Sequence, residues 1–249
     1  HAFFKALLFL SAGSVIHALH HEQNCKNMGN LRLKLPITYF FVILGSLALT
    51  GIPPFAGYFS KDLILEYAFS LHTLNGLNIY ILGCLGAFLT AVYSTRLLYL
   101  TFHGKTSIEE SSFNKIKEAP FIMLLPLFIL SIGAVFAGYL FYDLVSENSF
   151  WNNSIYFAKD ISFVDEAHHI KLIFKILPIL LVVTAIFLVF CSYKYIKNLS
   201  QICNKNLSNI TIFLKNKWYF DELYNFIFVK KISEMSNYLS SVIDIKIID

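Results

Sequence analysis

Charged side chains are scarce in this chain of 249 residues, since Asp, Glu, Lys and Arg together make up 14% of it. Soluble domains carry about 25% charged residues. Hydrophobic residues instead make up 56%, and the mean hydropathy is +0.60. This composition excludes an ordinary soluble domain and predicts a polytopic membrane protein. The net charge of +4 bears on membrane topology, because no basic stripe with interleaved aromatics indicates nucleic-acid binding.

Sequence motifs that hold cofactors are also missing. The four cysteines are scattered, without the C-x-x-C spacing that marks many metal and redox sites. They are Cys25, Cys84, Cys191 and Cys203. No G-x-G-x-x-G stretch offers a dinucleotide site. We therefore expect this chain to bind no flavin, Fe–S cluster, nicotinamide or metal, and to form no disulfide.

The chain also lacks an initiating methionine and a signal peptide. Its first residue is His1, and the sequence opens inside an apolar helix without a polar leader. We expect it to be a piece of a longer protein, with its upstream helices missing or encoded elsewhere.

Long apolar runs predict an all-α bundle with about five membrane spans. One span is discontinuous, because Pro53-Pro54 divides it into halves that are each shorter than the roughly 20 residues a crossing needs. The predicted spans are Ala2–Ala18, Ile37–Ser70, Ile79–Phe102, Phe121–Leu140 and Leu172–Tyr193. The transmembrane bundle then occupies 1–194, a basic linker 195–217, and an amphipathic helix with 3-4 apolar spacing 218–249.

The distribution of charge predicts which side each loop faces. The loops after Ala18 and Phe102 and the tail after Tyr193 are rich in Lys and Arg, whereas the opposite loops carry more Asp and Glu than Lys. Basic loops stay on the cytoplasmic side, or on the matrix side in a mitochondrion. We therefore expect the basic linker on that side.

Three basic residues remain inside apolar helices, namely Lys5, Lys61 and Arg96. A charge at membrane depth costs about 3 kcal/mol or more, so it persists where it faces water or a partner and marks an ion path. Lys61 lies just beyond the helix break, where irregular backbone is buried in protein or lines a hydrated cavity. Lys5 follows His1 at i, i+4, so the two share a helix face. We predict that Lys61, Lys5 and His1 form a proton relay, since burial favours neutral lysine and histidine titrates near neutral pH.

Other interpretations of these residues stay open. Lys61 and Asp62 could form a structural ion pair at the break, although adjacent helical residues point about 100° apart. Arg96 is better explained by snorkelling to the membrane surface. Three histidines are typical of a helix leaving the membrane, with a metal cluster as the less favoured alternative: His17, His20 and His21. The amphipathic helix either lies on the lipid surface or packs on neighbouring subunits.

Four stretches of the chain form a distinctive series. They are His1 to Leu10, Gly51 to Pro54, Gly57 to Asp62 and Trp218 to Tyr224. In this order, they resemble the largest antiporter-like subunit of respiratory complex I, called subunit L in bacteria and chain 5 in mitochondria. The resemblance extends over nearly the whole chain, and its last stretch is similar to the segment that leads into the long lateral helix of that family.

The resemblance implies a fold and a set of functional residues. The chain would form the C-terminal part of the second inverted repeat, with one discontinuous helix, followed by the start of the lateral helix. Lys61 would be the proton-channel lysine of this repeat, and Lys5 and His1 would be the lysine and histidine of the preceding helix on the central hydrophilic axis. Asp62 would be the acidic neighbour of the channel lysine, and Arg96 a basic position of unassigned role.

The resemblance also implies partners and a membrane. Other membrane subunits of complex I, above all the adjacent antiporter-like subunit, would surround the chain, together with the lipid bilayer and the missing N-terminal half of the same subunit. Flavin, Fe–S clusters and quinone would be bound by partner subunits. The membrane would be the bacterial inner membrane or the mitochondrial inner membrane.

Three functions are compatible with these observations. The first is a proton-translocating subunit of NADH:quinone oxidoreductase, an enzyme whose redox sites lie in other subunits. The second is a subunit of a multisubunit cation/proton antiporter. The third is a structural or assembly subunit that braces its neighbours. The segment from Trp218 to Tyr224 favours the first function, which is our prediction.

Overall fold

Helices account for all the regular secondary structure that the computed structural model shows in its described residues. Those residues are 1–71, 73–142, 154, 170–196 and 207–243. Contacts divide the chain into two units, His1–Tyr195 and Ile196–Asp249, and each is described by itself. The predicted all-α membrane bundle is thereby confirmed as the fold class.

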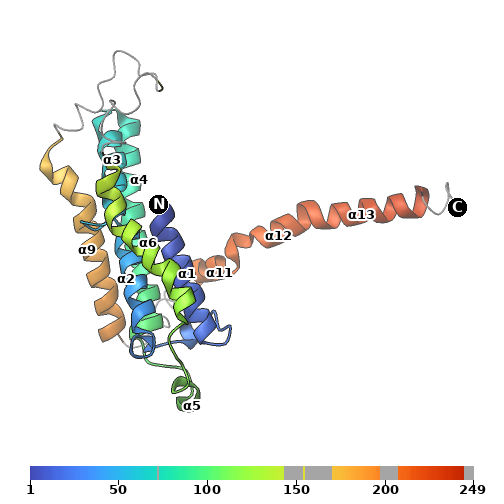
Figure 1. Cartoon of the computed structure of the whole chain (residues 1–249). Coiled ribbons are helices and arrows are strands. Elements are labelled where there is room, and N and C mark those ends of the chain that lie inside the picture. The colour runs from blue at the N-terminus through green and yellow to red at the C-terminus, as the bar shows by residue number, and fades with distance from the viewer. Residues whose placement is uncertain (72, 143–153, 155–169, 197–206, 244–249) are drawn as a thin grey trace. The chain divides into compact units, whose positions relative to one another are not determined.

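Long helices form the body of the first unit (Figure 1). They are α1 (Ala2–Ala18), α2 (Pro36–Thr50), α3 (Ala56–Ser70), α4 (Leu74–Leu98), α6 (Phe121–Leu140) and α9 (Leu172–Tyr195). α1 packs on α2 and α6, α3 packs on α4 and α6, and α9 packs on α4. Short helical pieces complete the unit: η1 (Cys25–Asn27), η2 (Leu31–Leu33), the π-helical turn η3 (Tyr99–His103) and α5 (Glu110–Phe113).

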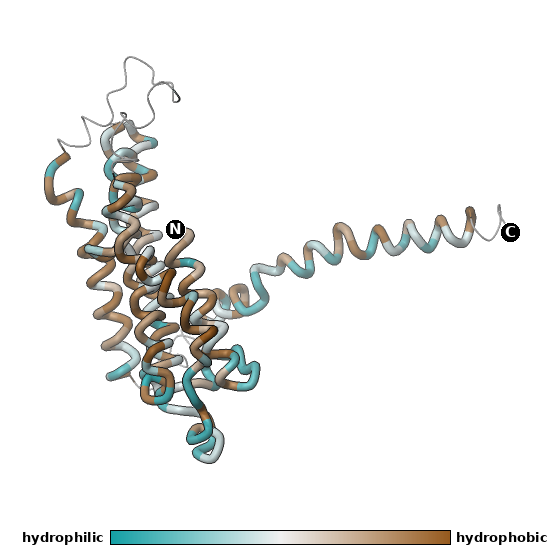
Figure 2. Tube along the Cα trace, in the orientation of Figure 1, coloured by the Kyte–Doolittle hydropathy of each residue, from teal (hydrophilic) through white to brown (hydrophobic). Residues whose placement is uncertain are grey.

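Three stretches of the described residues are long and apolar enough to cross a membrane. They are Leu74–His103, Phe121–Leu140 and Leu172–Tyr195, whereas α1 and α2 are shorter apolar helices. The first stretch begins at Leu74 instead of the predicted Ile79, because the hydroxyl of Thr73 accepts a hydrogen bond from the N–H of Gly76 and caps the helix. Figure 2 shows hydrophobic residues along these helices and hydrophilic residues in many of the connecting loops.

The predicted interruption at Pro53-Pro54 separates α2 from α3. α2 ends before Gly51, which has a left-handed backbone with φ +79°, and α3 begins at Ala56. The two helices follow one another along the bundle (Figure 1). Their ends approach so closely that a Cβ atom added to Gly57 would lie 1.7 Å from the carbonyl oxygen of Ala48. Glycine at this position therefore permits the two half-helices to join.

Two loops that are distant in sequence meet at one end of the bundle. The N–H of Ser107 donates to the carbonyl of Met28 at 3.3 Å, and its hydroxyl donates to the carbonyl of Lys26 at 3.2 Å. A buried apolar cluster includes residues of both loops and of the helices that they connect: Val15, Met28, Leu31, Leu35, Val42, Phe102 and Ile116. Two of the loops predicted to be basic thus share one end, and the side of the membrane that they face stays a prediction.

Glu118, near the end of the second of these loops, caps the N-terminus of α2. Its carboxylate accepts hydrogen bonds from the N–H of Ile37 at 2.9 Å, from the N–H of Thr38 at 3.4 Å and from the Thr38 hydroxyl at 2.5 Å. The first N–H groups of a helix have no intrahelical acceptor and carry a partial positive charge, which a carboxylate offsets. Because Thr38 is fully buried, this contact fixes where the first half of the discontinuous helix begins.

The second unit is also helical in its described part. It contains α11 (Ser208–Lys215), η4 (Lys217–Tyr219), α12 (Phe220–Tyr224), η5 (Asn225–Val229) and α13 (Lys230–Leu239). Hydrophobic and hydrophilic residues alternate along it in Figure 2. α11 lies inside the predicted linker, because Ile210, Phe213 and Leu214 extend the 3-4 apolar spacing upstream.

The predicted boundaries of the three segments stay predictions. Residues 197–206 of the linker, which include Cys203, and residues 244–249 of the predicted amphipathic helix lie outside the described residues.

Candidate functional site

Lys61 lies at the junction of the two half-helices, as the sequence predicts. Its side chain is half-buried, and its ammonium group donates a hydrogen bond to the carbonyl oxygen of Thr50 at 3.2 Å. In a continuous α-helix that carbonyl would accept the N–H of residue 54, but Pro54 has none. Gly51 leaves room for the lysine stem, since a Cβ atom there would lie 3.1 Å from Lys61 Cδ. The helix break therefore creates the acceptor that Lys61 uses.

The C-terminus of α2 suits a cation in a second way. The last carbonyl groups of a helix carry a partial negative charge, so an ammonium group placed there is stabilised. Glu118 at the opposite end of α2 and Lys61 at this end thus each match the dipole of the same helix. The carbonyl groups at this end of α2 therefore favour an ammonium group on Lys61.

Asp62 is buried, with 9% of its surface exposed. Its side chain forms no hydrogen bond or ion pair with any described residue, and Lys61 is not its partner. Lys61 donates to Thr50 instead, so no close ion-pair contact between Lys61 and Asp62 supports the alternative interpretation of a structural pair. The functional role predicted for Asp62 stays a prediction.

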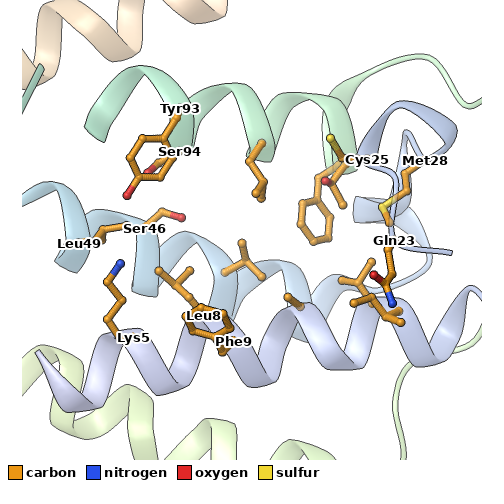
Figure 3. Close-up of a pocket in the computed structure, with 17 residues that line it drawn as sticks. Lys5, Leu8, Phe9, Gln23, Cys25, Met28, Ser46, Leu49, Tyr93 and Ser94 are labelled. Atoms are coloured by element: carbon orange, nitrogen blue, oxygen red, sulfur yellow. The ribbon is translucent and has the colours of Figure 1, made fainter. Parts of the chain in front are cut away.

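Lys5 lines a cavity of about 290 Å³ between α1, α2, α4 and the loop that follows α1. Figure 3 shows its ammonium group at one end, near the hydroxyls of Ser46 and Tyr93, with Ser94 close by. The Ser94 hydroxyl is buried and has no hydrogen-bond partner within the described part of the chain. The rest of the lining is largely apolar and reaches Gln23 in the loop. A cavity of this size has room for several water molecules, each of which occupies about 30 Å³ in the liquid.

His1 lies on a different cavity, of about 200 Å³, formed by α1, α3 and α6. Its exposed ring contacts Phe4 edge to face, with the ring centroids 5.2 Å apart. Ser60, the neighbour of Lys61, lines the same cavity. His1 and Lys5 are thus one helical turn apart but open onto two cavities. The Lys5 N–H donates to the His1 carbonyl at 3.1 Å as part of the helix, but no side-chain hydrogen bond among the described residues joins any two of Lys61, Lys5 and His1.

Arg96 does not join the other candidate residues. Its guanidinium Nε donates to the hydroxyl of Tyr193 at 2.9 Å, so it links α4 to the end of α9. The side chain is exposed and lies towards the end of α4 where the basic loops meet. The contact gives Arg96 a structural partner, and its predicted functional role is untested.

The three histidines at the end of α1 occupy an exposed turn. His20 and His21 both have left-handed backbone conformations, with φ of 51° and 74°. No group of three or more His, Cys, Asp or Glu residues within the described ranges is arranged to hold a metal ion.

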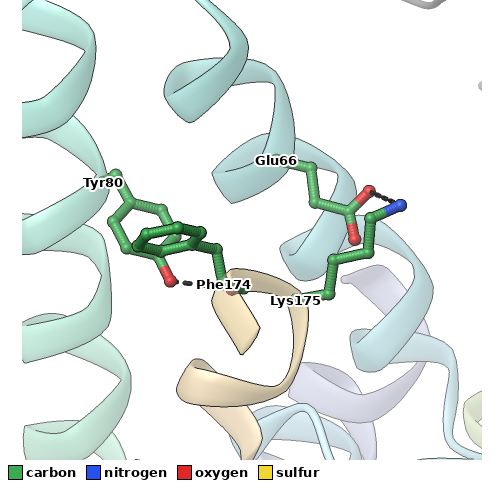
Figure 4. Close-up of polar contacts among 4 residues, drawn as sticks. All are labelled: Glu66, Tyr80, Phe174 and Lys175. Atoms are coloured by element: carbon green, nitrogen blue, oxygen red, sulfur yellow. Dashed lines mark hydrogen bonds and ion pairs between the residues drawn. The ribbon is translucent and has the colours of Figure 1, made fainter. Parts of the chain in front are cut away.

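Sequence reasoning missed an ion pair between α3 and α9. Lys175 Nζ lies 3.5 Å from Glu66 Oε2 (Figure 4). Lys175 lies in the first turn of α9, which begins at Leu172. The available signal was the i, i+4 spacing of Asp62 and Glu66 on α3, which puts two carboxylates on one face. Their partner on another helix has no signature in a single sequence.

The comparisons with known proteins support one family. The family model described as "NADH:quinone oxidoreductase/Mrp antiporter, TM" matches residues 1–90, and the model described as "NADH dehydrogenase subunit 5 C-terminus" matches residues 93–246. NADH-quinone oxidoreductase subunit L of Rickettsia bellii is 45% identical over 241 residues, which cover 94% of this chain and 36% of that protein. NADH-ubiquinone oxidoreductase chain 5 of Chondrus crispus is 43% identical over 237 residues, which cover 90% of this chain and 35% of that protein.

This chain thus spans a little over a third of the length of these two curated relatives. One family model covers more than half of it, and the two models together cover nearly all of it. The chain belongs to the family of NADH dehydrogenase subunit 5 and corresponds to its C-terminal part.

Proposed function

We propose that this chain is the proton-translocating C-terminal part of a membrane subunit of NADH:quinone oxidoreductase. NADH oxidation and quinone reduction, which the names of the relatives state, would take place in other subunits and drive proton movement here. The observation that carries the proposal is the hydrogen bond from Lys61 to the Thr50 carbonyl at a break between two half-helices. Intramembrane basic residues at such breaks line ion paths.

The geometry supports a path in two parts. The cavity beside Lys5 reaches from the loop end of the bundle to the hydroxyls of Ser46 and Tyr93 (Figure 3), which suits entry of water and protons. Lys61 then holds the proton against the Thr50 carbonyl. His1 lines the cavity that includes Ser60, next to Lys61, and would act between the two lysines. A lysine can release its proton when a neighbouring charge changes, whereas arginine cannot.

The proposal extends to partners and location. Other membrane subunits of the complex, in particular the adjacent antiporter-like subunit, and the remainder of the same subunit would pack on the exposed apolar faces of the bundle. The chain would lie in the inner membrane of a bacterium or a mitochondrion. Flavin, Fe–S clusters and quinone would bind in partner subunits, and the free cysteines Cys25, Cys84 and Cys191 do not converge on a ligand set among the described residues.

Lys61→Ala and Lys61→Arg test this proposal in the assembled complex. Loss of the ammonium group in Lys61→Ala and loss of proton release in Lys61→Arg are both expected to lower the proton-to-electron ratio in proteoliposomes more than they lower assembly. Lys115→Ala, which removes an exposed loop lysine, is the control and should pump like the wild type. An assembled Lys61→Ala complex with an unchanged ratio would refute the proposal.

A subunit of a multisubunit cation/proton antiporter is the second candidate. The family model for residues 1–90 names both NADH:quinone oxidoreductase and the Mrp antiporter. Purification of the native assembly separates the two functions, because only the first assembly contains redox subunits with Fe–S clusters. The match of residues 93–246 to the C-terminus of NADH dehydrogenase subunit 5 favours the first.

A further inference from the structure

The ion pair between Glu66 and Lys175 joins α3 to α9 inside the bundle. The 3.5 Å contact is largely shielded, since 18% of the Glu66 side chain and 27% of the Lys175 side chain are exposed. Within the described part of unit His1–Tyr195, it is the only ion pair. Shielding a pair of charges from water costs desolvation free energy, so such a pair contributes little net stability. Holding α3 and α9 together therefore does not explain why this pair is present.

Neighbouring contacts hold the helices that carry Glu66 and Lys175 in position. The hydroxyl of Tyr80 donates to the carbonyl of Phe174 at 2.7 Å, and the rings of Phe69 and Phe174 stack with centroids 4.3 Å apart. Tyr80 is buried, and α4 thereby fixes the first turn of α9 beside α3 (Figure 4). Lys175 follows Phe174 directly, so its ammonium group is presented to Glu66 by a rigid support. The apolar packing already joins the helices without the pair.

The pair continues the line of ionisable groups that begins at Lys61. Asp62 follows Lys61, and Glu66 lies one helical turn beyond Asp62 on the same face of α3. Asp62 is buried and its carboxylate forms no hydrogen bond or ion pair among the described residues, whereas Glu66 pairs with Lys175. Along α3 this line leads from the helix break to the end of the bundle opposite the basic loops (Figure 1).

We propose that Glu66 is the proton-accepting group that follows Lys61 and Asp62 on the exit side, and that Lys175 is the positioning residue that makes Glu66 release the proton. The inference rests on the proposed function of Lys61. A proton leaves the Lys61 ammonium for the Asp62 carboxylate, so an N–H bond breaks and an O–H bond forms. It then passes to the Glu66 carboxylate, and Asp62 becomes an anion again.

Release follows from the charge of Lys175. When Glu66 is protonated, Lys175 has lost its counterion. When Glu66 gives the proton to water at the end of the bundle, the carboxylate pairs with the ammonium group again at the observed distance. The ion pair therefore stabilises the unprotonated carboxylate, so Glu66 holds a proton that arrives from Asp62 only briefly before it gives the proton to water.

The test uses the intact complex in proteoliposomes and measures assembly, electron transfer and proton pumping in parallel. Glu66→Gln is expected to slow pumping by about tenfold or more, a cautious value for loss of a positioned acid or base. Lys175→Met should slow pumping as well, and Lys175→Arg should restore it, because the charge alone is needed. Lys171→Met removes an exposed lysine just before α9 and is the matched control.

Exchanging the charges of Glu66 and Lys175 distinguishes a role in proton transfer from a purely structural ion pair between α3 and α9. The double variant Glu66→Lys with Lys175→Glu keeps a pair between α3 and α9 but places an ammonium group one turn from Asp62. We expect it to assemble and to pump as poorly as Glu66→Gln. Wild-type pumping by the exchanged pair or by Glu66→Gln would overturn the inference. If Lys61→Ala abolishes pumping and Glu66→Gln does not, only the inference about Glu66 is refuted. Full pumping by Lys61→Ala would instead refute the proposed function.

Discussion

At the scale of single residues, the bundle matches charges to unpaired backbone groups. Lys61 donates to the carbonyl of Thr50, which lacks an intrahelical donor because of Pro54. Glu118 accepts from the first N–H groups of the same helix. Each contact replaces a hydrogen bond that the helix end cannot make internally, and an unpaired buried backbone group costs about 1–3 kcal/mol. The polar side chains at both ends of α2 therefore help to fix where that helix begins and ends, whatever further role they have in function.

The prediction at this scale concerns Glu118. Glu118→Ala removes the acceptor of three hydrogen bonds at the start of α2, and loss of a helix cap costs about 1–2 kcal/mol. We expect amide hydrogen exchange of a peptide spanning residues 36–40 to become roughly tenfold faster in the intact complex, since about 1.4 kcal/mol corresponds to tenfold. Glu109→Ala, at an exposed position of the same loop, should leave that exchange unchanged. Equal rates in both variants would show that Glu118 does not cap α2.

At the scale of helices, the discontinuous span depends on close contact between α2 and α3. Sequence alone predicted the break, because two adjacent prolines exclude a continuous helix. It did not predict that Lys61 turns back to Thr50, since that contact depends on how closely Gly57 approaches Ala48. Nor did it predict the partner of Glu66, because Lys175 lies on a helix more than a hundred residues away in sequence. Local patterns indicate spans and intramembrane charges, whereas partners depend on packing between distant segments.

Two glycine variants test this junction. In Gly57→Ala the new methyl group would clash with the Ala48 carbonyl, so α3 must move away from α2 and carry Lys61 from its acceptor. Such overpacking typically costs about 1–3 kcal/mol. We expect less assembled complex after mild heating and a lower pumping rate in what remains. Gly13→Ala in α1 is the matched control, because nothing lies within 4 Å of its new methyl group. Similar behaviour of the two variants would contradict the close junction.

At the scale of the whole chain, the first unit has two ends of different composition. The Lys- and Arg-containing loops after α1 and after η3 meet at one end through Ser107 and Met28. The end of α3 and the start of α9 lie at the other, where Phe69 stacks on Phe174. Our proton path runs between these ends, from the cavity beside Lys5 to the pair of Glu66 and Lys175. Its direction across the membrane therefore depends on the orientation of the bundle.

Orientation can be measured with single cysteines in a variant that lacks the four native ones. Lys115→Cys lies in the exposed loop between η3 and α6, and Lys171→Cys lies just before α9 at the opposite end. Because Lys- and Arg-rich loops stay inside, a membrane-impermeant thiol reagent should label the first from the cytoplasmic or matrix side and the second from the other side. Labelling of both from one side would contradict the alternating spans. If each cysteine is labelled from the side opposite to the expected one, the arrangement of the spans stands but the proton path runs the other way. Glu66 and Lys175 would then lie at the entrance for protons instead of the exit.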